Sequence, residues 1–292
     1  MNPRPTTRIS SSAACQAAQW ELGPCAKVQT VKASERKESG AGTTRQRLLP
    51  GLSVRDGLTR HPFDLEFGVR TSGLVAGRDL KSGHRHDRHS TAYYGVAPSV
   101  FQALIKKWKR SGPVAAMEEF TFVDVGAGMG RAVLLASEMP FKAVVGVELN
   151  ATLTGIARRN AAVWRKAGRA HAPIRIVCGD AVEYKWPTGP CLAFLFNPFG
   201  ETVMRRLVKS WKRSFAGRAG ELDILYVNDE QEQVLEGHAG EGPDGLHRLF
   251  LGEVKRSRAD AIADYRILSN QPDGEYASSN VEDCSIWRWG KS

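Results

Sequence analysis

The sequence predicts an α/β protein with a doubly wound, mostly parallel seven-stranded sheet and an antiparallel strand pair at its C-terminal end. Three observations predict this class. From residue 120 onward, continuous apolar runs typical of doubly buried parallel strands alternate with amphipathic helical stretches. A glycine-rich segment follows the first apolar run. No helical pattern of comparable strength separates the last two runs, which indicates an antiparallel pair.

The expected strands and helices follow one another along the chain. The five expected parallel strands are at 120–125, 143–149, 174–179, 191–196 and 222–227, and the antiparallel pair is at 246–254 and 284–290. Helical spacing of apolar residues is found at 129–138, 151–168 and 201–215. In the second of these helices, the side chains expected on one apolar side are Leu153, Ile156, Ala157 and Val163.

Two segments precede this domain. Residues 1–55 are rich in Ser, Thr, Ala, Gly and Arg, and we expect a disordered basic extension there. Residues 56–118 are expected to form an N-terminal helical or lid segment, in which Pro98 begins a helix. The apolar stripe of that helix consists of Val100, Phe101, Leu104, Ile105 and Trp108.

Composition restricts the environment and the partners. The chain has 292 residues, of which 42% are hydrophobic, and no apolar run approaches the roughly 20 residues of a membrane span. The five cysteines are scattered and form no CxxC pair, so we expect a reducing cytoplasm and no disulfide framework. The net charge is +10, but ten basic and four acidic residues place +6 of it within residues 1–60. The basic balance permits an acidic partner or nucleic acid, without indicating a basic catalytic surface.

The glycine-rich segment is the strongest local motif. In FVDVGAGMGR, from Phe122 to Arg131, three glycines follow the first expected strand. Glycine permits positive φ and lacks the Cβ that would keep a ligand away from the backbone. A dinucleotide loop requires G-x-G-x-x-G, but the sixth position here is Arg131. The spacing therefore disfavours a dinucleotide.

Acidic residues at three strand ends indicate another cofactor. Asp124 stands two residues before the first glycine, where a pyrophosphate would approach. It suits S-adenosylmethionine, which carries an ammonium and a sulfonium group and no phosphate. Glu148 can accept hydrogen bonds from both ribose hydroxyls, which serves either cofactor, and Asp180 can accept one from an adenine amino group. Each acid alone is compatible with a helix N-cap or a solvated turn, but the three together predict this cofactor site.

The same motifs carry a family resemblance. VDVGAGMG, GVEL and GDA resemble the ordered motifs of class I, seven-strand S-adenosylmethionine-dependent methyltransferases. EFGVRTSG, YYGVAPSVF, PFKAVVGVELN and LFNPFG further resemble a bacterial set of stand-alone methyltransferase-domain proteins, distantly similar to seven-strand protein-lysine methyltransferases. The resemblance covers about residues 60–290 and implies a cofactor-binding methyltransferase domain at 119–292.

The resemblance also implies roles for individual residues. In related families a tyrosine at the position of Tyr94 closes over the methionine end of the cofactor, although ordinary packing also explains a tyrosine there. The chain departs from the family at Arg131, beside the loop, and at YVND (226–229), which replaces Tyr-x-Asn-Pro. The cofactor-binding candidates are Tyr94, Asp124, Gly126, Ala127, Gly128, Gly130, Glu148, Leu149, Asp180 and Ala181.

The fourth expected strand ends in a candidate catalytic segment, Asn197-Pro198-Phe199-Gly200. It resembles the Asn/Asp-Pro-Pro-Tyr/Phe signature of amino-group methyltransferases, although the second proline is missing and the aromatic residue has moved up by one. An amide oxygen and the next backbone carbonyl can accept both hydrogens of a target amine, and a nearby ring supports developing positive charge. A tight turn after the strand is the alternative. The candidate catalytic residues are Asn197, Pro198 and Phe199.

HRHDRH (84–89) contains three histidines and suggests a metal site. Arg85 and Arg88 lie between them and would repel a cation, and no cysteine or second cluster completes a ligand set. We therefore expect no metal, and a solvated basic loop near the active site.

Together these features predict an S-adenosylmethionine-dependent methyltransferase acting on an amine nitrogen, with a protein lysine favoured slightly over a small molecule. The alternatives are an RNA methyltransferase, a non-catalytic cofactor-binding module and NAD-dependent chemistry. The sequence identifies neither the methyl acceptor nor the oligomeric state.

Overall fold

A computed structural model describes residues 60–240, 245–269 and 279–290 of the chain. All of the described residues belong to one compact unit. The disordered extension expected at 1–55 lies outside the described residues.

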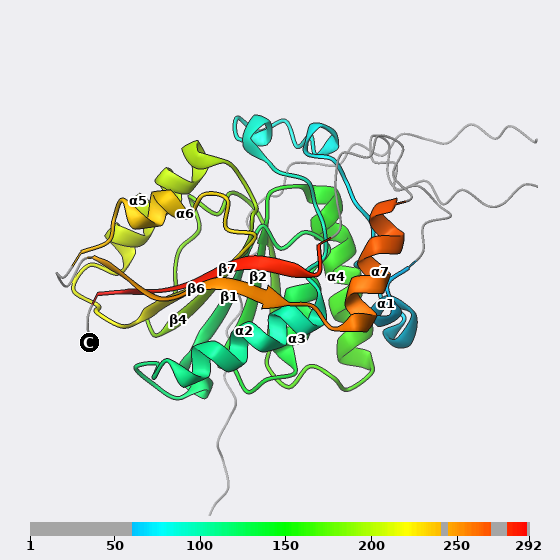
Figure 1. The fold of residues 1–292 in the computed structure, drawn as a ribbon, viewed down its shortest axis with the longest axis horizontal. Helices are drawn as coiled ribbons and strands as arrows, with labels where there is room; N and C mark the ends of the chain where they lie inside the picture. The colour runs from blue at the N-terminus through cyan, green and yellow to red at the C-terminus, as the bar shows by residue number, and fades with distance from the viewer. Residues whose placement is uncertain (1–59, 241–244, 270–278, 291–292) are drawn as a thin grey trace, which may run out of the picture. The chain divides into compact units, whose positions relative to one another are not determined.

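Seven strands form one sheet in the order β3-β2-β1-β4-β5-β7-β6 (Figure 1). Their bounds are β1 Thr121–Val125, β2 Ala143–Glu148, β3 Ile174–Cys178, β4 Cys191–Phe196, β5 Leu222–Val227, β6 Leu246–Lys255 and β7 Val281–Trp289. The first five strands pair in parallel, whereas β7 pairs antiparallel with both β5 and β6. The predicted fold class is confirmed.

Helices cover both faces of the sheet. The main helices beside it are α2 Pro98–Arg110, α3 Arg131–Ser137, α4 Ala151–Lys166, α5 Glu201–Ser214 and α6 Glu232–Glu236. Because successive strand residues point to opposite faces, Phe122 of β1 packs in a core with α2 and α3, while Val123 and Val125 pack with α5 and α6. Trp164 of α4 belongs to the first core. The sheet therefore has a helical layer and a hydrophobic core on each of its two faces, as expected for a doubly wound fold.

The centre of the sheet determines where a ligand can bind. β1 lies between β2 and β4, with Asp124 in register with Gly146 on one side and Phe194 on the other. From β1 the chain continues outward to β3, and then returns to β4 on the other side. Ligands of such sheets bind beyond the carboxyl ends of the strands at this switch point. Asp124 and Asn197 both lie at this edge.

Two details of the helices differ from the sequence prediction. A helix, α7 (Arg258–Ser269), lies between β6 and β7, where no strong helix was expected. Its weak apolar periodicity, with Ile262 and Tyr265 exposed, explains why the pattern did not reveal it. In α4, Val163 is 40% exposed and Trp164 is buried instead. The other predictions for α4 and α2 are confirmed. In α4 the buried residues include Leu153, Ile156 and Ala157, and in α2 every residue of the predicted apolar stripe is buried.

Residues 60–97 cross the carboxyl edge of the sheet as a strap of loops and short helices. They include α1 (Pro62–Phe67) and single 3-10 turns at Gly77–Asp79 and Asp87–His89. Isolated bridges join Val75 to Tyr93 and Ser90 to Phe199. We call residues 60–97 the strap. Within the described ranges, no helix is both long and apolar enough to cross a membrane.

A buried ion pair joins the sheet to α2. Asp223 of β5 is fully buried and accepts hydrogen bonds from Trp108 Nε1 at 2.7 Å and from Arg288 Nε at 2.7 Å. A second bond from Arg288 Nη2 spans 3.0 Å. Burial raises the pKa of Asp223, and the bonds from Arg288 and Trp108 oppose that rise. The pair therefore holds a helix, β5 and β7 together.

We expect Asp223→Ala to lower the free energy of unfolding by about 3–5 kcal/mol, because it leaves the buried Arg288 charge without its carboxylate. Denaturant unfolding measures the loss. The control is Glu201→Ala, which removes an ion pair to Arg205 whose two side chains are each 53% exposed. That control should cost about 1 kcal/mol or less. Equal losses in the two variants would contradict the role assigned to Asp223.

Candidate functional site

A cavity opens at the carboxyl ends of β1, β2 and β4, and the structure brings most of the predicted residues to it. Gly128, Gly130 and Asn197 do not line this cavity. The predicted residues that line it are Tyr94, Asp124, Gly126, Ala127, Glu148, Leu149, Asp180, Ala181, Pro198 and Phe199. We call it the first cavity.

The glycine loop is tightly packed by its protein neighbours. Gly126 has φ 74°, and a Cβ there would lie 2.6 Å from Pro198 Cβ. Gly128 has φ 54°, and its Cβ would lie 2.1 Å from Tyr93 Cε2. The missing Cβ atoms therefore admit Pro198 and Tyr93, rather than leaving the space for a ligand that the sequence suggested. Both positions therefore require glycine, because of this close packing and because of the left-handed backbone conformation.

Asp124 is the most unusual group in the first cavity. Its residue is only 4% exposed, and no hydrogen bond to its carboxylate is found among the described residues. Burial raises the pKa of Asp124 well above its usual value, and the nearby Glu148 carboxylate raises it further. A carboxylate in this position requires a cation or a proton.

Glu148, at the end of β2, has a different environment. Its Oε2 accepts a bond from Gly128 N at 2.8 Å and its Oε1 one from Asn150 N at 2.7 Å. Burial raises the pKa of Glu148, and these backbone bonds oppose the rise. The two donors orient the carboxylate while leaving further lone pairs for a ligand. Glu148 is therefore a fixed hydrogen-bond acceptor in the cavity.

Asp180 lies next to His86, a histidine of the HRHDRH stretch. Asp180 Oδ1 accepts from Val182 N at 2.9 Å, and Oδ2 lies 3.0 Å from Nδ1 of His86. Nε2 of His86 is 2.6 Å from Nη1 of Arg206, which can only donate, so Nε2 accepts and the proton is on Nδ1. Burial lowers the pKa of His86, against the pull of Asp180. His86 is thus buried and neutral, and the expectation of a fully solvated loop is wrong at this residue.

The same contacts bear on metal binding. Ligand atoms of His84, His86 and Asp180 lie within 4.8 Å of one another. Coordination through Nδ1 of His86 would move its proton to Nε2, against the Arg206 guanidinium. Among the described residues, Nδ1 of His86 and Oδ2 of Asp180 have no hydrogen-bond partner although they lie 3.0 Å apart, and the Arg206 contact at Nε2 disfavours coordination through Nδ1.

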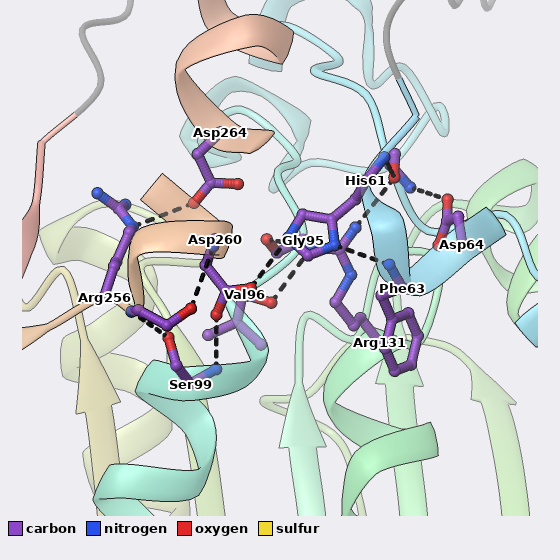
Figure 2. Close-up of polar contacts among 12 residues, drawn as sticks. His61, Phe63, Asp64, Gly95, Val96, Ser99, Arg131, Arg256, Asp260 and Asp264 are labelled. Atoms are coloured by element: carbon purple, nitrogen blue, oxygen red, sulfur yellow. Dashed lines mark hydrogen bonds and ion pairs between the residues drawn. The ribbon is translucent and has the colours of Figure 1, made fainter. Parts of the chain in front are cut away.

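Arg131, the departure from the family pattern, fixes the strap to the sheet (Figure 2). Its Nε donates to Thr71 Oγ1 at 2.7 Å, and its Nη1 donates to Gly95 O at 3.0 Å. Nη2 donates to Ser72 Oγ at 3.2 Å. Asp64 accepts from the backbone N–H groups of Thr71 and Ser72, each at 2.7 Å. The buried guanidinium therefore has a structural role that the sequence did not predict.

A second polar cluster attaches α7 to the strap (Figure 2). Asp260 accepts from Ser99 N at 2.8 Å and lies 3.4 Å from His61 Nε2. Burial tends to raise the pKa of Asp260, but hydrogen bonds from His61 and Ser99 outweigh it and lower the pKa to about 2. Asp264 is fully buried and lies 3.1 Å from Nε of Arg256. Residues far apart in sequence thus hold α7 at the carboxyl edge.

Tyr94 connects this cluster with the cavity. Its Oη donates to Asp264 Oδ1 at 2.5 Å. Burial, and then the Asp264 carboxylate, raise the pKa of Tyr94, so the phenol stays protonated. Tyr94 lines both the first cavity and a second one beside it. The hydroxyl is engaged with α7, which leaves the ring as the part that faces a ligand.

Asn197 has an unpaired polar atom. The residue is 7% exposed, has φ 37°, and its Oδ1 has no hydrogen-bond partner within the described part of the chain. Its backbone carbonyl accepts from Thr91 Oγ1, while Thr91 N donates to Pro198 O at 3.4 Å. The next backbone carbonyl, which the sequence analysis assigned to an amine, thus already has a partner in Thr91. The side-chain oxygen is buried and unpaired.

The sequence did not indicate Thr91 as part of the site, and it assigned no individual role to His86 or Asn228, although it singled out the segments that contain them. Asn228 follows β5 with φ 48°, as Asn197 follows β4. Asparagine tolerates this left-handed conformation better than most residues, so an Asn directly after each of two neighbouring strands was the available signal. Thr91 and His86 carry no such signal, because their contacts depend on the path of the strap.

Comparison with known proteins finds similar folds among solved structures, but no match in sequence. No protein-family model matches the sequence, and no curated protein matches it. The structure is similar to TrmN from Thermus thermophilus, with 16% identity, a TM-score of 0.42 and coverage of 66% of this chain and 49% of TrmN. The chain therefore spans about half of the length of that protein.

Two further solved structures are similar to this one, with comparable identities and TM-scores. Precorrin-6y C5,15-methyltransferase from Geobacter metallireducens has 15% identity and a TM-score of 0.42, covering 65% of this chain and 87% of that one. The [4+2]-cyclase SpnF has 16% identity and a TM-score of 0.46, covering 66% and 82%. Similarities of this size concern the fold alone, and function has to follow from the residues of the site.

We expect Asp124→Asn to raise the free energy of unfolding of the ligand-free protein near neutral pH. A carboxyl whose folded-state pKa is raised destabilises the fold above that pKa, and the amide removes the buried charge. The gain should shrink as the pH falls below the raised pKa, because the wild-type carboxyl is then neutral. Denaturant unfolding at several pH values measures it.

Glu148→Gln is the matched control for this prediction. Its carboxylate accepts two backbone hydrogen bonds, so the amide should bring loss rather than gain. Destabilisation by Asp124→Asn at every pH would show that the Asp124 carboxylate has a stabilising partner in the protein.

Proposed function

We propose that the chain is an S-adenosylmethionine-dependent methyltransferase that acts on an amine nitrogen. One observation carries the proposal. At the switch point of the sheet, the end of β1 holds a buried carboxylate, and the end of β4 is followed by a buried amide oxygen, neither of which has a hydrogen-bond partner among the described residues. The first requires a cation or a proton, and a cationic ligand would supply the former; the second requires a hydrogen-bond donor.

The residues of the first cavity fit the proposed cofactor. Asp124 would hold the ammonium of its methionine part, beside the backbone of Gly126 and Ala127. Glu148 has lone pairs left for the ribose hydroxyls. Asp180 and Ala181 would hold the adenine, with Asp180 oriented by Val182 N and the neutral His86. A dinucleotide fits less well, since its pyrophosphate would approach the Asp124 carboxylate.

Methyl transfer divides the work between the cofactor and this chain. The cofactor, when bound, supplies an electrophilic methyl group on a sulfonium and leaves as a neutral thioether. Asn197 Oδ1 would accept a hydrogen of the neutral acceptor amine and so direct its lone pair. Phe199, buried at the wall of the first cavity, would support the positive charge that develops on the nitrogen. The nitrogen loses one proton to solvent as the methyl group is gained.

Thr91 would act as a positioning residue in this mechanism. Its hydroxyl and its N–H hold the carbonyls of Asn197 and Pro198, which fixes the left-handed turn that presents the amide. The strap thereby links the cofactor side to the acceptor side. Alignment of this kind accounts for much of the rate of a displacement reaction.

We expect Asn197→Ala to leave the dissociation constant of S-adenosylhomocysteine within about threefold of wild type and to lower methylation at least about 100-fold. Calorimetry measures the first, and label transfer from S-adenosylmethionine to fractionated cell extract, lysine-rich peptides and diamines measures the second. Asn160→Ala is a control for damage to the fold, since Asn160 holds the strap by bonds to Arg70 O and Met129 O.

Three outcomes would contradict the proposal in different ways. Unchanged turnover in Asn197→Ala would remove Asn197 from the mechanism. Label in RNA and not in amines would assign an RNA acceptor. Binding of NAD in preference to S-adenosylhomocysteine would replace the cofactor.

A further inference from the structure

A second cavity lies beside the first and has a volume of about 630 Å³. Its walls come from the strap, from the segment after β5, and from the β6–β7 connection with Arg256 and Leu268. Thr91, Tyr94 and Phe196 line both cavities. The volume is within the usual range for a ligand site. A molecule in the second cavity would meet a molecule in the first at this shared wall.

Three residues form a row across one side of this cavity. Asn197 N donates to Val227 O at 3.1 Å, which places Asn197 beside the end of β5. Asn228 N donates to Asp283 O at 2.7 Å, so Asp283 of β7 lies beside Asn228. All three residues line the cavity. Neighbouring strands are about 4.8 Å apart, so the backbones of Asn197 and Asp283 are about 10 Å apart.

The row offers acceptors and negative charge. Asn197 is more than nine-tenths buried, and its Oδ1 is without a partner among the described residues. Asp283 and Glu230, which also lines the cavity, are exposed carboxylates. Among the described residues, the only side-chain contact recorded for either carboxylate is that from Asn228 Nδ2 to Glu230 Oε1 at 3.5 Å, which is at the limit of a hydrogen bond.

The cavity also contains two arginines. Arg256 is bound by two carboxylates, Asp264 at 3.1 Å and Glu282. Arg78 lines the cavity, is exposed and has an interaction of its own. Asp283 and Glu230 lie at one end of the row, and the unpaired amide oxygen of Asn197 lies at the other.

We propose that the second cavity binds an elongated dication, an aliphatic amine whose second positive charge lies about 10 Å from the nitrogen that reaches Asn197. This rests on the proposed function for the identity of the reacting nitrogen, whereas the binding itself does not. Asp283 and Glu230 hold the distant charge, and Asn197 holds the near nitrogen. A free polyamine and a lysine next to another basic group in a peptide share this chemistry. Nucleic acid does not, because both acids repel phosphate.

The test is calorimetry with spermidine, a short peptide containing two lysines, n-hexylamine and a short RNA, each with and without S-adenosylhomocysteine. Spermidine or the peptide should bind at least tenfold more tightly than hexylamine, and the stronger of the two identifies the source of the dication. Glu230→Gln with Asp283→Asn should abolish this preference and leave hexylamine binding unchanged. Asn197→Ala should weaken all amines similarly.

A matched charge control is Glu66→Gln with Glu118→Gln, two exposed acids that line neither cavity. This control should keep the preference for the dications, which separates the cavity from the overall charge of the protein. Retention of the preference in the Glu230/Asp283 variant, or tighter binding of RNA than of either dication, would overturn the proposal.

The outcome also separates this proposal from the proposed function. A preference for dications without methylation supports the cavity and contradicts methyl transfer to amines. Methylation of an amine without any preference supports the function and contradicts the cavity.

Discussion

Burial of the Asp124 carboxylate, without a hydrogen-bond donor in the part of the chain that the structure describes, is the constraint on which the site depends. The position follows from the sheet, because β1 is central and its carboxyl end is covered by the glycine loop and the strap. Burial and the neighbouring Glu148 both disfavour its charged form. A fold retains such a group at a cost in stability, and a cationic ligand offsets that cost. Our proposal of a cationic ligand therefore rests on Asp124 more than on the glycines.

The other contacts of the site can be understood as support for this edge of the sheet. Arg131 and Asp64 hold the strap in place, and Asp260 and Asp264 attach α7 to it (Figure 2). The strap then positions Thr91 against the Asn197 turn and Tyr94 between the two cavities. Polar side chains hold together segments that have little secondary structure of their own. The same segments form the walls of the second cavity.

The sequence predicted the sheet well, because continuous apolar runs and helical spacing are local signals. It also placed Asp124, Glu148 and Asp180 at strand ends, where order along the chain determines position in space. It missed α7, whose apolar residues lack a clear period, and the burial of His86, which depends on Asp180 and Arg206 from distant elements. It did not predict that the positions of the missing Cβ atoms of Gly126 and Gly128 lie against Pro198 and Tyr93. These contacts arise from tertiary packing, for which a single sequence carries no local signal.

We propose that Asp124 binds the cationic end of the cofactor. The most direct test is to titrate wild type and Asp124→Asn with S-adenosylhomocysteine and with methylthioadenosine, which has the same nucleoside but no amino acid part. The account predicts that the substitution weakens S-adenosylhomocysteine at least about tenfold, or 1.4 kcal/mol, and leaves methylthioadenosine unchanged. Equal loss for both ligands, or no loss for either, would contradict it.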